Sequence, residues 1–325
     1  MSQPPAHPPV PVYVLGHYNE AALALLQSTP TISPVLFTDP AHTAWPLHAV
    51  AILIRARTRL TAADFAAAPK LKYVVKQGVG VDAIDLAAAA RHGVRVYNTP
   101  AVNAEAVAEL SLALALAVAR RVCEMDRAIR RGERLLRAEW FSKSLYKTTV
   151  GVVGMGNIGR EVAAKWRGAM QARVVAYDPY FPAEGGWPGI EHERAVTLGE
   201  LLEVADVVTV HVPLTEGTRG LIGREEMARM KDGAILINAA RGGVVDEEAL
   251  LEALRRKKFW GVGLDACNVE PPTLEVYREF LEHENLVMMP HVGGDTVECQ
   301  IRSGLAAVET LIEAIAGGEP KGRQA

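Results

Sequence analysis

The stretch VGVVGMGNIGREV, residues Val150–Val162, decides the fold, because it joins a β-branched run to a helix-like segment through three glycines. Gly154, Gly156 and Gly159 have the spacing G-x-G-x-x-G directly after the predicted strand. The first glycine allows a tight turn, the second lets a pyrophosphate approach the backbone, and the third lets the helix pack closely on the strand. We therefore predict a strand–turn–helix unit whose helix N-terminus faces phosphate.

An acidic residue follows the next predicted strand, where VVAYDPY ends Arg173–Tyr177 with Asp178. A carboxylate there would accept hydrogen bonds from both hydroxyls of an adenine ribose, which indicates NAD as the cofactor. An arginine would have favoured the additional phosphate of NADP, but Pro179 and Tyr180 follow instead. Two alternatives stay open: glycine-rich turns also arise without a ligand, and an aspartate before proline also forms an ordinary strand-end turn.

The alternation of short β-branched runs with helix-like segments continues almost from end to end. It is typical of the α/β class, in which helices cover both faces of a parallel sheet. A chain of 325 residues favours two domains over one. The pattern breaks at NTP, Asn98–Pro100, before a long helix-like stretch from Asn103 to about Arg131, and again at MPHVGGD, Met289–Asp295.

The two series of predicted elements have different lengths. In the first series we expect strands near Val12–Leu15, Val35–Phe37, Val50–Ile54, Leu71–Lys76 and Arg95–Tyr97, with helices near Glu20–Gln27, Ala62–Ala67 and Ile84–Arg91. In the second we expect strands near Val150–Val153, Arg173–Tyr177, Val207–Val210, Ala234–Asn238, Gly261–Leu264 and Leu286–Met288, which suits a six-stranded dinucleotide domain. A final helix is expected from about Thr296 to Ala316.

Composition excludes several classes of function. The net charge of −3 gives no reason to expect nucleic acid or a membrane surface as a partner. The basic run within Arg120–Arg137 is interrupted by acidic residues, so we interpret it as a solvated helix face. The apolar run Ala106–Ala119 contains Glu109 and is too short to span a bilayer. The N-terminal residues lack the pattern of a signal peptide, and three scattered cysteines suggest a reducing compartment, so we expect a cytoplasmic protein.

Three polar residues follow successive predicted strands, at the edge where open α/β sheets bind ligands. Arg241, in INAARGGVVDEEAL, carries a permanent charge suited to a carboxylate and to polarising a carbonyl oxygen. His291 can exchange the proton of a hydroxyl while hydride passes to or from nicotinamide. Glu270 can hold the imidazole and raise its pKa. Each residue alone has a structural explanation, and the argument rests on the combination.

The chain resembles the NAD-dependent D-2-hydroxyacid dehydrogenase family in motifs that run in family order from about Arg55 to Gly304. The matching stretches are VKQGVGVDAIDL, NTPAVNAEAVAEL, VGVVGMGNIG, HVPLTEGTRGLI, INAARGGVVDEEAL, DACNVEPP and MPHVGGDT. The resemblance implies a flavodoxin-like substrate domain over residues 1–102 and 292–325, with an NAD-binding Rossmann domain, residues 103–291, inserted between its halves.

The same resemblance assigns residues to the site. It implies the catalytic roles given above for Arg241, Glu270 and His291. Backbone N–H groups of Val79 and Gly80, in a loop flanked by glycines, would bind the substrate carboxylate. Ala239 and Asp265 would lie near the nicotinamide carboxamide. The cofactor-binding set implied as a whole is Gly154, Gly156, Asn157, Ile158, Gly159, Asp178, Val212, Pro213, Ala239 and Asp265. Ala266 and Cys267 depart from the Val-Phe that the family commonly has there.

The identity of the acid stays open. LIRARTRLTAADFAAAPKLKYVVKQGVGVD and YDPYFP are similar to the 3-phosphoglycerate dehydrogenase branch, which makes 3-phosphoglycerate the first expectation. Arg55, Arg57 and Arg59 alternate, so an extended chain would place all three on one side as a phosphate cradle; an exposed strand-edge cluster is the alternative. Glyoxylate or hydroxypyruvate reduction and an NAD(H)-sensing, corepressor-like role are the other hypotheses. Formate oxidation is disfavoured by Glu270, because related formate enzymes have glutamine there.

The helix region Asn103–Arg121 is the basis for the expected oligomeric state. It carries more Leu, Ala and Val than one apolar stripe needs, so burial on several sides is expected. In the family this region contributes to a two-fold dimer, which predicts a homodimer; a core helix inside the monomer is the alternative. The remaining partner is a small 2-hydroxy or 2-keto acid, and we expect no metal ion.

Overall fold

The computed structural model describes residues 8–55, 58–182 and 184–325. The chain divides into two compact units, one made of Met1–Asn103 with Gly294–Ala325 and the other of Ala104–Gly293. The sequence analysis expected the boundaries after residues 102 and 291, and the two units divide after residues 103 and 293. Because both ends of the chain build the first unit, the second is an insertion in chain order.

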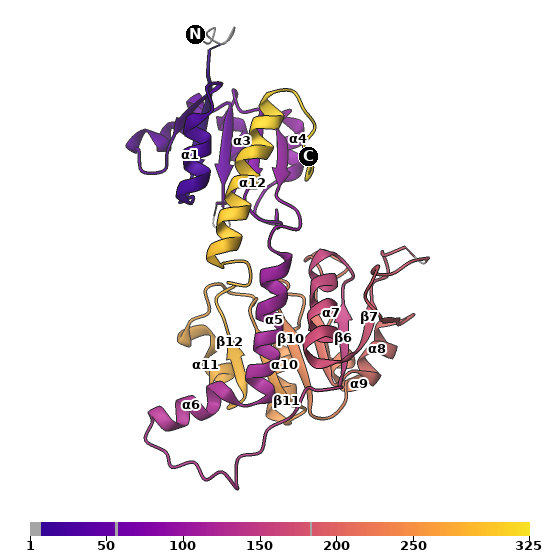
Figure 1. Ribbon diagram of the computed structural model, residues 1–325. Helices are drawn as coiled ribbons and strands as arrows, with labels where there is room; N and C mark the ends of the chain where they lie inside the picture. Colours follow the sequence, from indigo (N-terminus) through magenta and orange to yellow (C-terminus); the bar gives the residue numbers. More distant parts are fainter. Residues whose placement is uncertain (1–7, 56–57, 183) are drawn as a thin grey trace. The chain divides into compact units, whose positions relative to one another are not determined.

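The first unit contains a five-stranded parallel sheet in the order β2-β1-β3-β4-β5 (Figure 1). This is the flavodoxin-like strand order, so the predicted α/β class and the type of this domain are confirmed. The strands are β1 (Val10–Leu15), β2 (Ile32–Val35), β3 (Ala51–Ile54), β4 (Tyr73–Lys76) and β5 (Arg95–Asn98).

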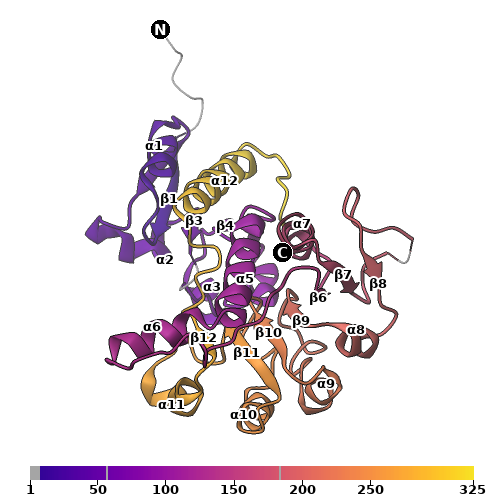
Figure 2. The same cartoon turned by 60° about the horizontal axis from the view of Figure 1, so that its bottom comes forward.

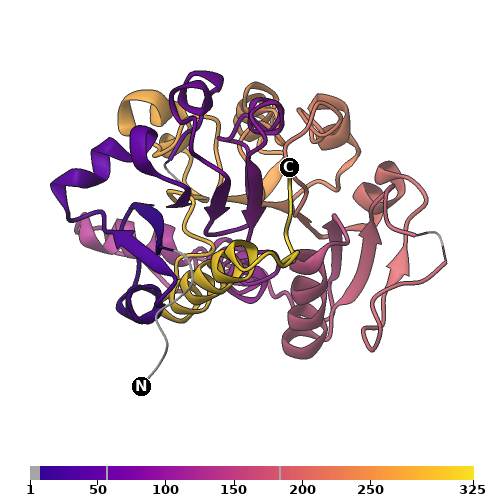
Figure 3. The same ribbon diagram turned by 90° about the horizontal axis from the view of Figure 1, so that it is seen from above.

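Helices cover both faces of this sheet. On one face α1 (Glu20–Ser28) and α12 (Val297–Ile315) lie side by side, as Figure 2 shows, over a core that includes Val12 and Leu53. On the other face α3 (Ala62–Ala67) and α4 (Leu86–Arg91) pack over the alternate residues of the same strands. The last residues of the chain run beside β5, where Arg323 pairs with Tyr97 in an antiparallel bridge (Figure 3).

Two details of the first unit differ from the sequence-based expectation. The second strand was expected at Val35–Phe37, but β2 ends at Val35 and includes Pro34. Proline is tolerated there because β2 is an edge strand, so the N–H that Pro34 lacks removes no hydrogen bond from the interior of the sheet. A 3₁₀ helix, η1 (Pro40–Ala44), and a short helix, α2 (Trp45–His48), connect β2 to β3 and were not expected.

The second unit contains a seven-stranded parallel sheet in the order β12-β11-β10-β9-β6-β7-β8. From β6 the chain runs outward through β7 to β8, and it then returns to β9 on the other side of β6, so the strand order reverses between β6 and β9, as in a Rossmann sheet. The expected count of six strands was one too low. The strand that was missed, β8, has only two residues at the sheet edge, too few for a periodic signal. The strands are β6 (Thr149–Val153), β7 (Arg173–Tyr177), β8 (Glu193–Arg194), β9 (Val207–Val210), β10 (Ala234–Asn238), β11 (Phe259–Leu264) and β12 (Leu286–Met288).

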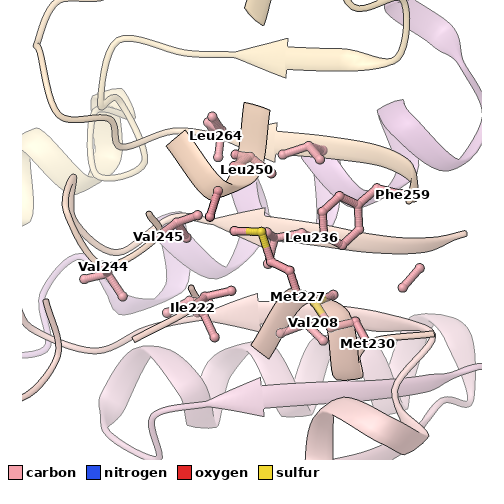
Figure 4. Close-up of a cluster of buried hydrophobic side chains, with 14 of the residues drawn as sticks. Val208, Ile222, Met227, Met230, Leu236, Val244, Val245, Leu250, Phe259 and Leu264 are labelled. Atoms are coloured by element: carbon pink, nitrogen blue, oxygen red, sulfur yellow. The ribbon is translucent and has the colours of Figure 1, made fainter. Parts of the chain in front are cut away.

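Alternate residues of the central strands face two different helix layers. Ile235 and Ile237 of β10 face α5 (Ala104–Ala119) and α7 (Asn157–Met170). Leu236, between them, faces α9 (Arg224–Arg229) and α10 (Glu247–Arg255), which Figure 2 shows on the opposite side of the sheet from α5. Figure 4 shows side chains of this second core, among them Met227, Met230, Val208 and Leu236. The remaining helices are α8 (Leu198–Val204) and α11 (Leu274–Glu282).

The single helix expected from Asn103 to about Arg131 is in fact two helices. α5 ends at Ala119, and α6 (Val122–Arg130) begins after Arg121, whose φ of 54° lies in the left-handed region. This conformation costs about 1–2 kcal/mol for a residue with a Cβ. Arg121 offsets the cost by a two-pronged bond to the Glu124 carboxylate, with its Nε 2.7 Å from Oε2. In the described part of the chain no helix is long and apolar enough to cross a membrane.

Candidate active site

Two of the three glycines in the turn after β6 are required by the protein itself. Gly154 has a φ of 100°, and a Cβ on it would lie 2.5 Å from the carbonyl oxygen of His211. A Cβ on Gly159 would lie 2.1 Å from the carbonyl oxygen of Gly154. These positions serve the tight turn and the close packing of α7 on the sheet.

Gly156 has a different environment, because, apart from the residues next to it in the chain, no described atom lies within 4 Å of where its Cβ would be. It caps α7, whose first residues are Asn157 and Ile158. The backbone N–H groups of the first helical turn have no partner inside the helix and attract an anion. The open space at Gly156 therefore fits a dinucleotide pyrophosphate at the start of a 14-residue helix.

Asp178, directly after β7, is bound to the glycine turn. Its carboxylate accepts the N–H of Met155 at 2.9 Å and, through the other oxygen, the N–H of Tyr180 at 2.9 Å. The half-buried carboxylate is thereby fixed beside the turn, which suits the ribose contact that the sequence indicates. After β9, the side chain of Val212 lies against the same turn, 3.0 Å from the Cβ position of Gly154, and Pro213, which follows it, is exposed.

A hydrogen-bonded pair of titratable residues lies after β11 and β12. His291 Nδ1 is 2.8 Å from Oε2 and 3.0 Å from Oε1 of Glu270, and the N–H of Cys267 donates to Oε1 at 3.2 Å. His291 has a φ of 60°, a left-handed conformation that is uncommon for a residue with a side chain. With Nδ1 at Glu270, Nε2 is the ring nitrogen left to exchange a proton with a ligand.

Each member of this pair changes the pKa of the other. The hydrogen bond from Glu270 raises the pKa of His291 above its ordinary value, against the opposing effect of burial. Burial raises the pKa of Glu270, but the hydrogen bond and charge of His291, the Cys267 N–H and the charge of Arg241 outweigh it, so the net pKa is lowered. The pair therefore favours a charged imidazolium beside a charged carboxylate.

Asp265, the residue after β11, holds the loop that carries His291. It is buried, and its carboxylate accepts the N–H groups of Val292 and Gly293, each at 2.9 Å. The N–H of His291 donates to its carbonyl oxygen at 2.8 Å. Burial raises the pKa of Asp265, partly offset by the two N–H bonds. Asp265 thus fixes the backbone on which His291 stands.

Arg241 lies in the loop after β10, three residues beyond the end of the strand. Its Nη1 donates to the carbonyl oxygen of Ala240 at 2.7 Å, and its charge lowers the pKa of both Glu270 and His291, so the guanidinium lies near the pair. Ala239, between the strand and Ala240, is buried.

Asn238, the last residue of β10, is a residue that the sequence reasoning missed. Its side-chain Nδ2 donates to the carbonyl oxygens of Arg241 at 3.0 Å and Ala266 at 3.2 Å, and its Oδ1 accepts the N–H of Ala240 at 3.1 Å. It joins the loops after β10 and β11. The available signal was an amide at the end of the otherwise apolar strand AILIN.

The loop that carries Glu270 has a second support that was also missed. Glu247, the first residue of α10, accepts the N–H of Asn268 at 2.7 Å and lies 3.2 Å from the hydroxyl of the buried Tyr277. The same hydroxyl accepts the N–H of Val269 at 2.9 Å. Burial raises the pKa of Glu247. Cys267, where the sequence departs from Val-Phe, is buried in this loop, and burial raises its thiol pKa to about 11.

Val79 and Gly80 belong to the first unit, in the loop after β4. Gly78, which precedes them, has a φ of 101°, and its N–H donates to Thr99 Oγ1 at 2.8 Å. Asn98 Nδ2 donates to the carbonyl oxygen of Val79 at 2.7 Å. The backbone N–H groups of Val79 and Gly80 have no partner among the residues that the structure describes.

The expected row of Arg55, Arg57 and Arg59 stays a prediction. Arg57 lies outside the described residues. Arg55 itself donates to the carbonyl oxygen of His17 at 2.5 Å and to Gln300 Oε1 at 2.6 Å. The arginine side chain closest to β3 is therefore held by the first unit's own groups.

A Rossmann sheet with a glycine turn, a carboxylate directly after the next strand and a histidine–carboxylate pair at its carboxyl edge is typical of a nicotinamide-dependent oxidoreductase. The family model described as "D-isomer specific 2-hydroxyacid dehydrogenase, NAD binding domain" matches residues 112–293. The chain belongs to the D-isomer specific 2-hydroxyacid dehydrogenase family, NAD-dependent oxidoreductases that act on CH–OH groups. The expected family and the NAD cofactor are confirmed.

Individual relatives are named for different activities. A hydroxypyruvate reductase from Thermotoga maritima is 41% identical over 81% of this chain and 83% of its own length. A D-3-phosphoglycerate dehydrogenase from Mycobacterium leprae is 42% identical over 82% of this chain, but this chain spans only about half of that relative, 49%. The crystal structure of the TT0316 protein from Thermus thermophilus has a TM-score of 0.84 and 36% identity, covering 97% of this chain and 100% of that one.

Proposed function

We propose that His291 is the acid and base of the reaction, that Glu270 holds it protonated for reduction, and that Arg241 binds the substrate carboxylate. The observation that carries this proposal is the 2.8 Å contact between His291 Nδ1 and Glu270 Oε2, which raises the imidazole pKa and leaves Nε2 for the substrate oxygen. Bound NADH supplies the hydride to the carbonyl carbon. As the oxygen gains charge, His291 Nε2 gives it a proton, so no free alkoxide forms.

The substrate carboxylate needs donors that do not titrate near neutral pH. The guanidinium of Arg241 suits this role, because its planar pair of N–H donors matches the two oxygens of a carboxylate. The N–H groups of Val79 and Gly80 are further proposed donors, supported by their lack of other partners in the described chain and by the positive φ of Gly78 before them. In this proposal the second unit binds the cofactor and carries Arg241 and His291, and the first unit carries Val79 and Gly80.

Hydroxypyruvate is the 2-keto acid that we propose as the substrate for reduction. It is supported by the hydroxypyruvate reductase that matches over most of its length, and by Arg55, whose guanidinium is engaged by His17 and Gln300 rather than directed to a phosphate. The second candidate is 3-phosphohydroxypyruvate, with 3-phosphoglycerate as its reduced form. It is favoured by relatives 42% identical to this chain that carry that activity in their names.

The test is a kinetic panel with NADH and four keto acids: hydroxypyruvate, 3-phosphohydroxypyruvate, glyoxylate and a bulky apolar acid. We expect hydroxypyruvate to have the highest kcat/KM, with turnover on the order of 1 per second or faster. A kcat/KM at least about tenfold higher for the phosphorylated acid, a difference of about 1.4 kcal/mol, would replace the proposed substrate and keep the chemistry. Absence of turnover with all four acids at saturating NADH would contradict the catalytic proposal and favour an NAD(H)-sensing role.

The oligomeric state is a separate proposal. α5 packs against α7, β10, β11 and β12, so much of its apolar surface is buried within the second unit. Exposed apolar residues do remain on α6, where Val122 and Ile129 are 54% and 62% exposed. We retain the homodimer as the proposed state, and sedimentation at micromolar concentration tests it, because a mass of 35.1 kDa would identify a monomer.

A further inference from the structure

Trp187 lies in the loop between β7 and β8, and its side chain bonds to the glycine turn after β6. The indole is 4% exposed and belongs to the core that also contains Val162 of α7. Its Nε1–H donates to the carbonyl oxygen of Met155, the residue between Gly154 and Gly156, at 3.0 Å. A side chain 32 residues further along the chain is thus bonded to the backbone of the cofactor turn.

The two backbone groups of Met155 are held by different side chains. Its N–H donates to Asp178 Oδ2 at 2.9 Å, and its carbonyl oxygen accepts the indole N–H of Trp187. The N–H belongs to the peptide unit that joins Met155 to Gly154, and the carbonyl belongs to the unit that joins it to Gly156. Asp178 and Trp187 therefore fix two successive peptide units, and Trp187 fixes the one that ends at Gly156.

The bond from Trp187 sets the direction of the Gly156 N–H. The peptide unit between Met155 and Gly156 is trans, so it is planar and its C=O and N–H point to opposite sides. The C=O points to the buried indole, and the N–H therefore points away from that core. Gly156 itself is exposed, with open space at its Cβ position. Its N–H has no hydrogen-bond partner among the residues that the structure describes.

The indole of Trp187 is itself held on two sides. The ring of His192 lies against it, with the ring centroids 4.8 Å apart, and His192 Nδ1 lies 2.7 Å from the carbonyl oxygen of Ile190. The N–H of Ile190 donates back to the carbonyl oxygen of Trp187 at 3.2 Å. On the other side, Cζ2 of the indole lies 3.4 Å from the Cβ position of Gly159 in the first turn of α7. The donor to Met155 is therefore fixed in position.

We propose that Trp187 is a positioning residue of the cofactor site, which holds the peptide unit between Met155 and Gly156 so that the Gly156 N–H faces the diphosphate of bound NAD(H). This N–H adds a donor to those of the first turn of α7. Because the indole orients it before the cofactor arrives, binding does not have to order the turn. The inference concerns the NAD site alone and does not depend on the roles proposed for His291, Glu270 and Arg241.

Two matched substitutions separate this role from a purely structural one. Trp187→Phe keeps an aromatic ring in the core and removes the N–H that holds Met155. Trp166→Phe is the control, because Trp166 is fully buried in the same core and its Nε1 has no hydrogen-bond partner in the described part of the chain. Titration with NADH, followed by NADH fluorescence, gives Kd for the folded fraction alone, because unfolded chains reduce the number of sites and leave Kd unchanged.

Both variants lose the same atoms from one core, so we expect both to have a lower thermal midpoint. We expect Trp187→Phe alone to raise the Kd for NADH, by at least about fivefold, because the Gly156 N–H is no longer held toward a charged acceptor. Trp166→Phe should stay within about twofold of the wild type. Equal changes of Kd in the two variants, or an unchanged Kd in Trp187→Phe, would overturn the proposal and assign Trp187 to packing alone.

Fragments of the cofactor show which group the peptide unit serves. Adenosine carries the ribose that Asp178 is expected to bind but no phosphate, and ADP adds the diphosphate. Displacement of NADH by each fragment, measured in the wild type and in Trp187→Phe, gives the two affinities. We expect the variant to bind ADP more weakly by about the same factor as NADH, and adenosine within about twofold of the wild type. An equal loss with adenosine would show that Trp187 supports the whole turn, including the bond from Met155 to Asp178, and would overturn the assignment to the Gly156 N–H.

Discussion

The two halves of the NAD-binding sheet are built on opposite principles. In the half around β6 and β7, the turn depends on the absence of side chains. A Cβ on Gly154 or Gly159 would collide with backbone atoms, and the space beside Gly156 is open. In the half around β10, β11 and β12, the loops depend on side chains that hold other groups, with Asp265 fixing the backbone of His291 and Glu270 fixing its ring. Binding and proton transfer are therefore separable by mutation.

The largest expected effect lies in the second half. Asn is the substitution of choice for His291, because it tolerates the left-handed φ of 60° and can still bond to Glu270, yet it has no proton to exchange near neutral pH. We expect His291→Asn to reduce kcat by at least about a hundredfold, with the Kd for NADH within about twofold of the wild type. Stopped-flow rates and NADH fluorescence measure the two quantities. A variant with nearly full activity would show that His291 does not transfer the proton.

The glycine turn offers the converse test, with its own control. Gly156→Ala meets no described protein atom, so we expect an unchanged thermal midpoint and a Kd for NADH raised by about tenfold, because the added Cβ stands where the pyrophosphate approaches. Gly159→Ala forces a Cβ to 2.1 Å from a backbone oxygen and should destabilise the protein without NAD, by about 1–3 kcal/mol or more. Loss of stability in both variants would show that Gly156 also serves packing.

A third test alters the pKa of His291 and leaves the residue in place. Glu270→Gln keeps the size and a hydrogen-bond acceptor but removes the negative charge that raises the imidazole pKa. The protonated imidazole should then be lost at a lower pH, so the fall in kcat/KM for keto acid reduction with rising pH should begin earlier than in the wild type. Oxidation of the hydroxy acid, which needs the neutral imidazole, should extend to lower pH. Superimposable pH profiles would exclude electrostatic coupling as the role of Glu270.

The smallest effect is expected behind Glu270, in its supporting loop. Tyr277→Phe keeps the buried ring but loses the hydroxyl that contacts Val269 and Glu247. We expect kcat to fall a few-fold, in keeping with about 0.5–1.5 kcal/mol for one hydrogen bond, with little change in NADH affinity. Tyr146→Phe, which loses an exposed bond to Gln171, is the matched control. Equal kinetics in the two variants would leave Tyr277 without a part in positioning Glu270.

What the sequence could predict depends on how local the cause is. The glycine turn was predictable because each glycine is required either by nearby backbone atoms that leave no room for a Cβ or by the approach of the ligand. Glu270 and His291, 21 residues apart, were predictable as a pair because they follow β11 and β12, which are neighbours in the sheet. Because ligands of open α/β sheets bind at the carboxyl ends of the strands, such residues can be predicted without knowing the whole fold.

The features that the sequence analysis missed depend on contacts that the sequence does not mark. Asn238 holds two loops whose separation the sequence does not reveal, and Tyr277 reaches its loop from another helix. The break at Arg121 has no Gly or Pro to mark it and depends on the bond to Glu124.

The discontinuous first unit has a consequence for protein synthesis. The second unit is one uninterrupted stretch, Ala104–Gly293, and can fold as soon as it has left the ribosome. The first unit emerges earlier, but its core lacks Ala307, Val308 and Leu311 until α12 has been translated. Its sheet must therefore wait, with the apolar face that α12 will cover still open to solvent and to chaperones, until the whole of Ala104–Gly293 has been synthesised. The part of the chain that is made first is the last to become native.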